Sequence, residues 1–156
     1  MKNDTDGPPP LVEAVSRSAW NRALFGLGRV PLQQSWGYGA AMAQLGLGVT
    51  RLSAERDSKT VAAAQVIERR LAGRFRLETV LNGPLWGAAA TDRDRQAFLK
   101  QLRARYRRRS VAFLLIAPDR GDSVETTRLY RTIGAHRVMT GSEPKRLVLT
   151  RAHEYK

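Results

Sequence analysis

The stretch from Asp92 to Ala117 reads DRDRQAFLKQLRARYRRRSVAFLLIA, and its two halves have different periodicities. Residues 92–108 repeat apolar side chains every three or four positions, which predicts a helix with one buried stripe. Four residues form that stripe: Phe98, Leu99, Leu102 and Tyr106. Residues 111–117 are continuously apolar, which predicts a strand buried on both faces. A helix that leads into a buried strand is typical of α/β folds.

The predicted helix has recognisable signals at both ends. Thr91 can cap its first turn, and Asp92 and Asp94 lie where the helix dipole favours negative charge. Five arginines crowd the other end, where the dipole favours cations: Arg103, Arg105, Arg107, Arg108 and Arg109. We therefore interpret the two aspartates as helix charges rather than as catalytic groups.

Three strands are predicted ahead of this helix. Residues 49–55 and 60–69 flank a polar turn at 57–59, a pattern that predicts a hairpin. Residues 75–81 alternate apolar and polar side chains, as a half-buried strand does. Together the three segments predict a meander that leads into the helix.

Two further helices are predicted near the N-terminus, at residues 12–25 and 35–45, and glycines follow each of them. The proline-rich residues 1–11 are expected to form a disordered leader. Behind the buried strand, Ser123 can cap another helix, which Gly134 ends.

Two short strands are predicted near the C-terminus, at residues 135–139 and 147–150. The whole order is then α, α, β, β, β, α, β, α, β, β. This order predicts a single domain over residues 12–156, an α/β fold with a mixed sheet and helices on its faces.

The chain has 156 residues and a net charge of +13, from 27 basic and 14 acidic residues. Residues 61–120 hold 13 of the basic and 5 of the acidic residues, so the excess lies in the middle of the chain. This distribution favours an anionic partner on a folded face: a nucleic acid, a phosphate-bearing substrate or an anionic membrane surface. A solvated basic face without such a partner is the alternative.

The sequence also argues against several kinds of chemistry. It has no cysteine, which excludes disulfides and thiolate metal sites, and its two histidines are His136 and His153. A zinc enzyme or a Ser-His-Asp hydrolase is therefore not expected, and no metal site is predicted. No secretory signal is found, and no stretch approaches the roughly 20 apolar residues that span a bilayer. We expect a cytoplasmic location, with peripheral contact at the inner face of the membrane left open.

Three segments occur in order along the chain: LQQSWGYG at residues 32–39, VAAAQV at 61–66 and LNGPLW at 81–86. They resemble segments of FemAB-type aminoacyl/peptidyl-transferases, and the resemblance runs over about residues 15–150. A further segment, LYRTIGAHRV at 129–138, is similar to a GNAT segment in which a helix ends at a glycine and enters a strand. The resemblance implies a GNAT-like acyl-CoA N-acyltransferase fold, equivalent to the N-terminal half of a FemAB-type protein.

FemAB-type proteins contain two GNAT-like halves and transfer an amino acid from aminoacyl-tRNA to the peptide of a lipid-linked peptidoglycan precursor. For this chain the resemblance implies a role in cell-wall synthesis, with aminoacyl-tRNA as donor and no resident cofactor. The chain is about as long as one half. We therefore expect either a second GNAT-like half in trans or a truncated product that is inactive alone, and no catalytic residue is assigned.

The resemblance also suggests where a substrate binds. We expect substrate contacts at seven positions: Gln34, Trp36, Tyr38, Arg70, Gly83, Pro84 and Trp86. The aromatic residues can line a groove for a sugar or a peptide, and Arg70 can contact a pyrophosphate or an anionic lipid. Burial of Trp36 in the core and simple solvation of Arg70 are the alternatives. Ser35, within the same segment, is better explained as a helix cap.

Two other functions stay open. An acetyltransferase that uses acetyl-CoA normally carries a Q/R-x-x-G-x-G/A loop before the central helix, where backbone amides hold the pyrophosphate. The corresponding stretch here, GPLWGAAATD at residues 83–92, lacks that pattern. A nucleic-acid-binding module is the other alternative, based on the arginines at 103–109, although no helix-turn-helix, RRM or zinc-finger motif is found.

Overall fold

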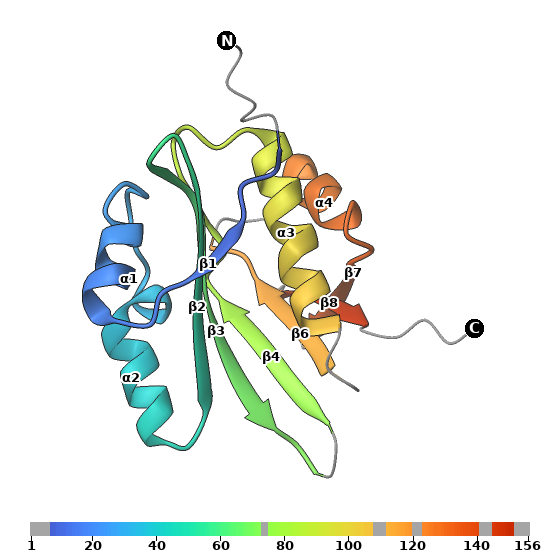
Figure 1. Ribbon diagram of the computed structural model, residues 1–156. Helices are drawn as coiled ribbons and strands as arrows, with labels where there is room; N and C mark the ends of the chain where they lie inside the picture. Colours follow the sequence, from blue (N-terminus) through green and yellow to red (C-terminus); the bar gives the residue numbers. More distant parts are fainter. Residues whose placement is uncertain (1–6, 73–74, 108–111, 120–122, 141–144, 152–156) are drawn as a thin grey trace.

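The computed structural model describes residues 7–72, 75–107, 112–119, 123–140 and 145–151. Within these residues the backbone forms one eight-stranded mixed sheet in the order β1-β2-β3-β4-β6-β8-β7, with β5 paired to β3 (Figure 1). The strands are β1 (Leu11–Glu13), β2 (Gly48–Arg56), β3 (Lys59–Arg70), β4 (Arg76–Leu81), β5 (Leu85–Trp86), β6 (Ala112–Ala117), β7 (His136–Thr140) and β8 (Lys145–Arg151). The helices are α1 (Arg17–Leu24), the short 3-10 helix η1 (Leu32–Gln34), α2 (Trp36–Gln44), α3 (Asp92–Arg107) and α4 (Val124–Arg131).

Helices cover both faces of the sheet. Figure 1 shows α1 and α2 on one face and α3 and α4 on the other. Successive side chains of β3 point to opposite faces of the sheet and so contribute to the cores on both faces. Ala62 and Ala64 belong to the core under α3 and α4, and Ala63 belongs to the core under α1. The stripe predicted on α3 is fully buried against the sheet. The predicted α/β class with a mixed sheet is therefore confirmed.

The meander and the buried strand also occur where they were predicted. β2 and β3 form the hairpin, and Asp57 and Ser58 have φ angles of 51° and 59°, as a tight primed turn requires. β6 is less buried than expected, since Leu114 and Ile116 are buried but Phe113 is only half-buried. The reason is that the α1–α2 layer lies over β2 and β3 rather than over β6.

The first predicted helix is shorter than expected. Residues 11–13 pair with β2 as β1, and α1 begins only after Ser16. The Ser16 hydroxyl accepts a hydrogen bond from the Ala19 N–H and so caps the helix. The prediction of a helix over residues 12–25 therefore placed its start too early in the chain.

Of the leader predicted at residues 1–11, the structure describes residues 7–11, and residues 1–6 lie outside the described residues. Gln101 on α3 fixes it, donating to the Pro9 carbonyl oxygen and accepting from the Leu11 N–H. These bonds join residues 92 and 90 positions apart, so no local pattern in the sequence could have indicated them.

The pairing between β3 and β4 is interrupted. Ile67 pairs with Thr79, and pairing resumes only where Ala63 meets Leu85, so three residues of β3 face five residues of the neighbouring chain. The interruption contains a cis Gly83–Pro84 bond and Asn82 with a φ of 48°. Such a bulge bends the strand away from its other neighbour. Beyond the Leu81–Ala117 pair, the chain therefore stays with β3 and separates from β6.

Gln34 fills the interruption from η1. Its side chain is fully buried: Nε2 donates to the Leu81 carbonyl oxygen at 2.6 Å, and Oε1 accepts from the Gln65 N–H at 2.7 Å. These are backbone groups of β4 and β3 that the bulge leaves without ladder partners. The Gln34 carbonyl oxygen in turn accepts from the Trp20 indole at 2.9 Å. One side-chain amide thus replaces a missing peptide group and ties the α1–α2 layer to the broken strand.

No helix in the described part of the chain combines the length and the apolar character needed to cross a bilayer.

We expect Gln34→Ala to lower the free energy of unfolding by about 2–5 kcal/mol, because it leaves two buried backbone groups unpaired. Urea unfolding measures the change. Gln44→Ala, at an exposed position of α2, is the matched control and should change stability by less than about 0.5 kcal/mol. Equal stability of the two variants would contradict the bridging role of Gln34.

Candidate functional site

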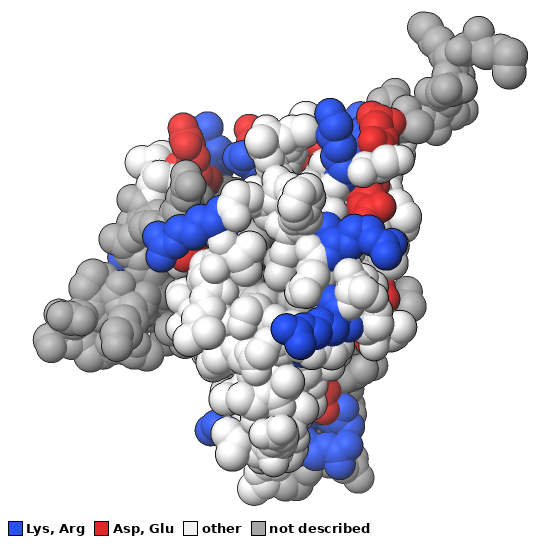
Figure 2. Space-filling view, turned by 90° about the vertical axis from the view of Figure 1, so that its left-hand side faces the viewer, with Lys and Arg blue, Asp and Glu red and all other residues white. Residues whose placement is uncertain are grey.

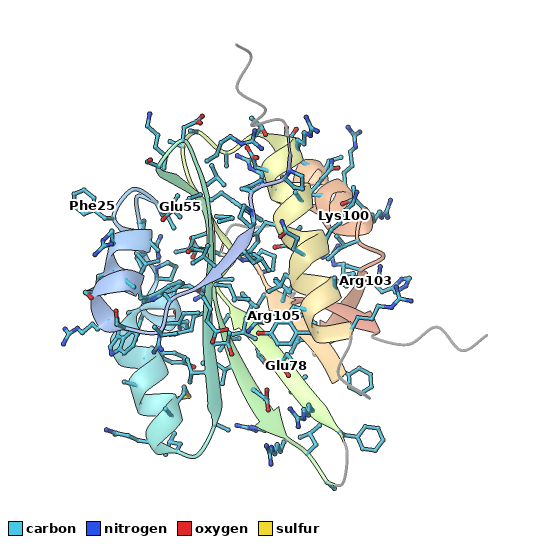
Figure 3. The ribbon with its side chains drawn as sticks, viewed as in Figure 1. Phe25, Glu55, Glu78, Lys100, Arg103 and Arg105 are labelled. Carbon is cyan, nitrogen blue, oxygen red and sulfur yellow. The ribbon has the colours of Figure 1, made fainter. Side chains whose placement is uncertain are left out.

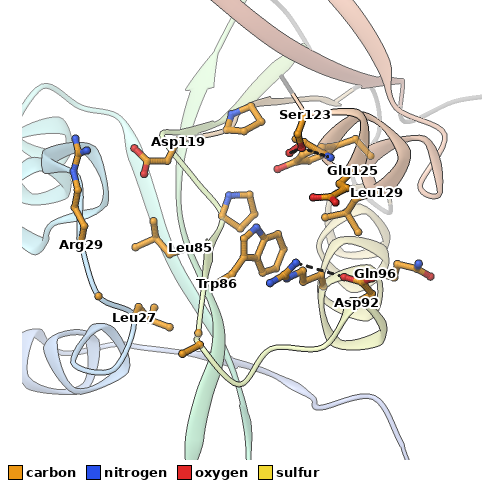
Figure 4. A pocket seen from close by; sticks show the side chains of 18 of the residues that line it. Leu27, Arg29, Leu85, Trp86, Asp92, Gln96, Asp119, Ser123, Glu125 and Leu129 are labelled. Carbon is orange, nitrogen blue, oxygen red and sulfur yellow. Dashed lines mark hydrogen bonds and ion pairs between the residues drawn. The ribbon is translucent and has the colours of Figure 1, made fainter. Parts of the chain in front are cut away.

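A cleft of about 1070 Å³ opens where the parallel strands β4 and β6 end (Figure 4). Its walls are the 84–88 segment, the first turns of α3 and α4, the end of β6 at Pro118 and Asp119, and the 26–29 loop that follows α1. In α/β sheets, ligands bind in the crevice beyond the carboxyl ends of strands that separate. The bulge in β4 therefore creates the space for a ligand-sized site.

The floor of the cleft is apolar. Leu85 and Trp86 of β5 contribute to it, together with Pro84 and with Leu129 from α4. Trp86 is held by an edge-to-face contact with Phe98 of α3, with the ring centroids 5.9 Å apart and the rings inclined at 84°. The indole is therefore a fixed flat surface on which a ligand can lie.

Charged side chains of both signs line the cleft. The acidic residues are Asp92, Asp119 and Glu125, and the basic residues are Arg29, Arg95 and Arg128. Arg95 and Asp92 form an exposed ion pair at 3.4 Å. Figure 4 shows Arg29 and Asp119 on the side of the cleft opposite Asp92 and Gln96. A mixed set of charges suits a ligand that itself carries both ammonium and carboxylate groups.

Tyr130 lines the cleft from the end of α4, with only 4% of its surface accessible. Burial raises the pKa of its phenol well above the ordinary value. The hydroxyl is protonated at neutral pH, as in an ordinary tyrosine, and its raised pKa makes it a hydrogen-bond donor rather than a source of protons.

The N-terminus of α3 is occupied by side chains of the protein itself. The Thr91 hydroxyl accepts from the Asp94 N–H at 3.2 Å, and the Asp94 carboxylate accepts from the Thr91 N–H and hydroxyl at 3.0 and 2.7 Å. Arg56 donates to the same carboxylate at 2.6 Å. This reciprocal cap confirms the predicted helix start, with Asp92 adding a second carboxylate. Two carboxylates at this helix end disfavour a diphosphate there.

The hydrogen bonds to Asp94 decide its ionisation. Burial alone would raise the pKa of this carboxyl, but the hydrogen bonds from Thr91 and Arg56 outweigh burial, and the pKa lies below its ordinary value. The carboxylate therefore holds the first turn of α3, which forms one wall of the cleft.

Three of the expected substrate-binding residues meet at the cleft. Pro84 and Trp86 line it, and Gly83 lies directly behind them, where its N–H donates to the Ala117 carbonyl oxygen at 3.2 Å. A Cβ on Gly83 would come within 2.8 Å of Gln34 Nε2, so the position has no room for a side chain. Gln34 itself supports the cleft from behind, because its amide is engaged by the backbone.

Trp36, Tyr38 and Arg70 lie away from this cleft. Trp36 opens α2 and is half-buried under Arg51, whose guanidinium lies 3.7 Å from the ring centroid, a cation–π contact. Ser35 caps α2 by accepting from the Tyr38 N–H at 3.2 Å, as predicted. Arg70 lies eight residues along β3 from the partner of Trp86, or about 26 Å in an extended strand.

The predicted arginine cluster on α3 does not form a single basic surface in the described residues. Arg105 is paired with Glu13 of β1, and Arg103 packs beside Gly134 after α4. Arg107 is exposed, and residues 108–109 lie outside the described residues.

Pro84 and Trp86 are the expected site residues among those that line the cleft, and the unexpected lining residues include Arg29, Asp119, Glu125 and Tyr130. Asp119 follows a predicted buried strand, and polar residues at that position often face a binding crevice. For Arg29 and Glu125 the sequence holds no comparable signal. No group of three or more metal-ligating side chains comes together within the described ranges.

Comparison with known proteins identifies the fold. No known protein family and no curated protein sequence matches this chain. The solved structure of FemX matches with a TM-score of 0.66 and 12% identity, over 82% of this chain and 32% of FemX. A putative GNAT acetyltransferase from Desulfovibrio desulfuricans matches with a TM-score of 0.60 and 11% identity, over 92% and 99% of the two chains. Aminoglycoside acetyltransferase AAC(6')-Ib, in complex with coenzyme A, matches at 0.57 and 14% identity, over 91% and 95%.

These matches define the fold as GNAT-like, which confirms the expectation from the sequence, and FemX is among the structures that share it. The chain spans about a third of the length of FemX and nearly the whole length of the two acetyltransferases.

We expect Asp94→Asn to lower the free energy of unfolding near neutral pH by about 1–3 kcal/mol, because it weakens buried charge-assisted hydrogen bonds. The folded-state pKa lies below the unfolded value of about 3.9. The stability that the carboxylate contributes is therefore present above about pH 4 and is lost as the pH falls through the folded-state pKa.

Urea unfolding over a pH series should show the difference between wild type and Asp94→Asn shrinking in acid. The control is Asp92→Asn, because the Asp92 side chain is 87% exposed and should matter little at any pH. A difference that stayed constant across the acid range would contradict the role given to the Asp94 charge.

Proposed function

We propose that this chain is a GNAT-like domain of a FemAB-type transferase, and that its cleft binds the acceptor peptide of a peptidoglycan precursor. The observation that carries the proposal is the cleft itself, which combines an aromatic floor with charges of both signs. A stem peptide has an amine acceptor and several carboxylates, so it matches such a lining. The likeness to FemX and the ordered segments LQQSWGYG and LNGPLW support the same choice.

The transfer reaction forms an amide and breaks an ester. The acceptor amine loses a proton, its nitrogen bonds to the carbonyl carbon of the aminoacyl donor, and the ribose oxygen leaves and takes up a proton. Asp119 and Glu125 are cleft carboxylates suited to accept the amine proton, and the Tyr130 hydroxyl is suited to donate a hydrogen bond to the leaving oxygen. A second GNAT-like half would present the aminoacyl-tRNA, since this chain matches about a third of FemX.

Acetyl-CoA-dependent acyl transfer is the second candidate. Tyr130 favours it, because a phenol at the cleft can donate a hydrogen bond to a leaving thiolate. The carboxylates at the start of α3 disfavour this candidate, because they would repel the diphosphate of the cofactor at that helix end.

Trp86 provides a direct test, because it is the tryptophan that lines the cleft among the three in the sequence. A soluble stem peptide with a free side-chain amine should change the intrinsic fluorescence in a saturable way. Trp86→Phe should abolish this change while keeping an aromatic ring against Phe98, and Trp36→Phe should retain it. No change at millimolar peptide, or a change that survives in Trp86→Phe, would overturn the proposal.

The two candidates are separated by thermal unfolding with acetyl-CoA. A ligand that binds only the folded state stabilises it by about 2.7 kcal/mol at a hundredfold excess over its Kd. We expect no rise of the unfolding midpoint with acetyl-CoA and a rise with the stem peptide. The reverse result would replace the peptide-binding proposal with acyl transfer from coenzyme A.

A further inference from the structure

Exposed apolar side chains gather at the end of the sheet opposite the cleft. Leu71 and Phe75 lie at the tip of the β3–β4 hairpin and are 44% and 48% exposed, and the Leu71 N–H donates to the Phe75 carbonyl oxygen. Leu45, in the turn after α2, is 72% exposed. The register of β2 and β3 pairs Gly48 with Glu68, so the turn that carries Leu45 lies at the same end as the hairpin tip.

Positive charge lies beside Leu71 and Phe75 on the hairpin. Arg69 and Arg70 are exposed at the last positions of β3, and Arg70 pairs with Arg76 of β4. The acidic neighbour Glu68 is already engaged by Arg76 at 3.2 Å, so it does not neutralise Arg69 or Arg70. Figure 2 shows uncharged surface at the lower end of the molecule, with basic side chains on both sides of it and acidic surface beside one of them.

We infer that this end of the molecule, formed by Leu45, Arg69, Arg70, Leu71 and Phe75 and called here the basic–apolar tip, docks on an anionic lipid surface. Apolar side chains that enter the headgroup region and arginines that meet lipid phosphates are the two contributions that such binding needs. The aliphatic leucines favour a bilayer over an RNA, because RNA recognition uses stacking rings and base-reading polar groups that leucine lacks.

The arrangement also positions the cleft. β3 runs from the tip to the partner of Trp86, so a docked tip would hold the cleft about 26 Å from the headgroups, in water. This inference does not depend on what the cleft binds, and its test uses no cleft ligand.

The test is co-sedimentation of the full chain with vesicles of phosphatidylcholine, either alone or mixed with phosphatidylglycerol. The wild type should pellet with the mixed vesicles at low salt and remain in solution with phosphatidylcholine alone. Leu71→Ser combined with Phe75→Ser should weaken the binding at least tenfold. The matched control is Phe25→Ser, since Phe25 is 90% exposed after α1 and lies at the other end of the molecule from the tip (Figure 3), and its loss should change nothing.

A second pair of variants separates the effect of charge at the tip from the effect of the net charge of the whole chain. Arg69→Gln with Arg70→Gln should weaken binding by about fivefold for each arginine. Arg17→Gln with Arg22→Gln removes the same charge from exposed positions of α1 and should leave binding intact. Unchanged thermal unfolding verifies that the exposed substitutions do not unfold the chain.

Three results would overturn the inference: no sedimentation of the wild type with anionic vesicles, equal losses in the tip and control variants, or vesicle binding that survives the tip substitutions. Binding of a tRNA that the tip variants lose while vesicle binding persists would assign the tip to RNA instead.

Discussion

The Gln34 side-chain amide stands between β3 and β4 in the place of a missing peptide group. The bulge that begins after Thr79 removes ladder partners from two buried backbone groups, and each unpaired group would cost about 1–3 kcal/mol. Gln34 satisfies the Gln65 N–H and the Leu81 carbonyl oxygen together. The sheet can therefore tolerate an interruption in its centre, and that interruption is what separates β5 from β6 and opens the cleft.

The position of Gln34 also explains why a glycine occupies position 83 and why the chain after it has a fixed path. Gly83 has no space for a Cβ because Gln34 lies behind it, and its N–H is already held by Ala117. The chain then returns to β3, which brings Trp86 against Phe98 and turns its ring toward the cleft. A residue first considered as a ligand contact is thus a support for the residues that line the site.

The cleft differs chemically from a diphosphate-binding site at the N-terminus of α3. In a GNAT fold the start of the central helix is where an anion can be held by backbone amides, yet here Thr91 and Asp94 cap that helix and Asp92 adds further negative charge. Arg56 stabilises this arrangement from β2. Charge at the helix end, together with the mixed charges around the cleft, is the reason why we propose a zwitterionic peptide rather than a diphosphate as the ligand.

The sequence by itself determined the class of the sheet, the stripe on α3, the cap at Thr91 and the order of the elements apart from β1, η1 and β5, because each of these depends on residues that are close together in the chain. A local motif also predicted Pro84 and Trp86 as substrate contacts, and both line the cleft. Only the tertiary structure decided that Arg29, Asp119, Glu125 and Tyr130 share one cleft with Trp86, that Gln34 is a bridge, and that Gln101 orders the N-terminal segment. Those features join residues tens of positions apart, and a period of two or 3.6 residues carries no information about such pairs.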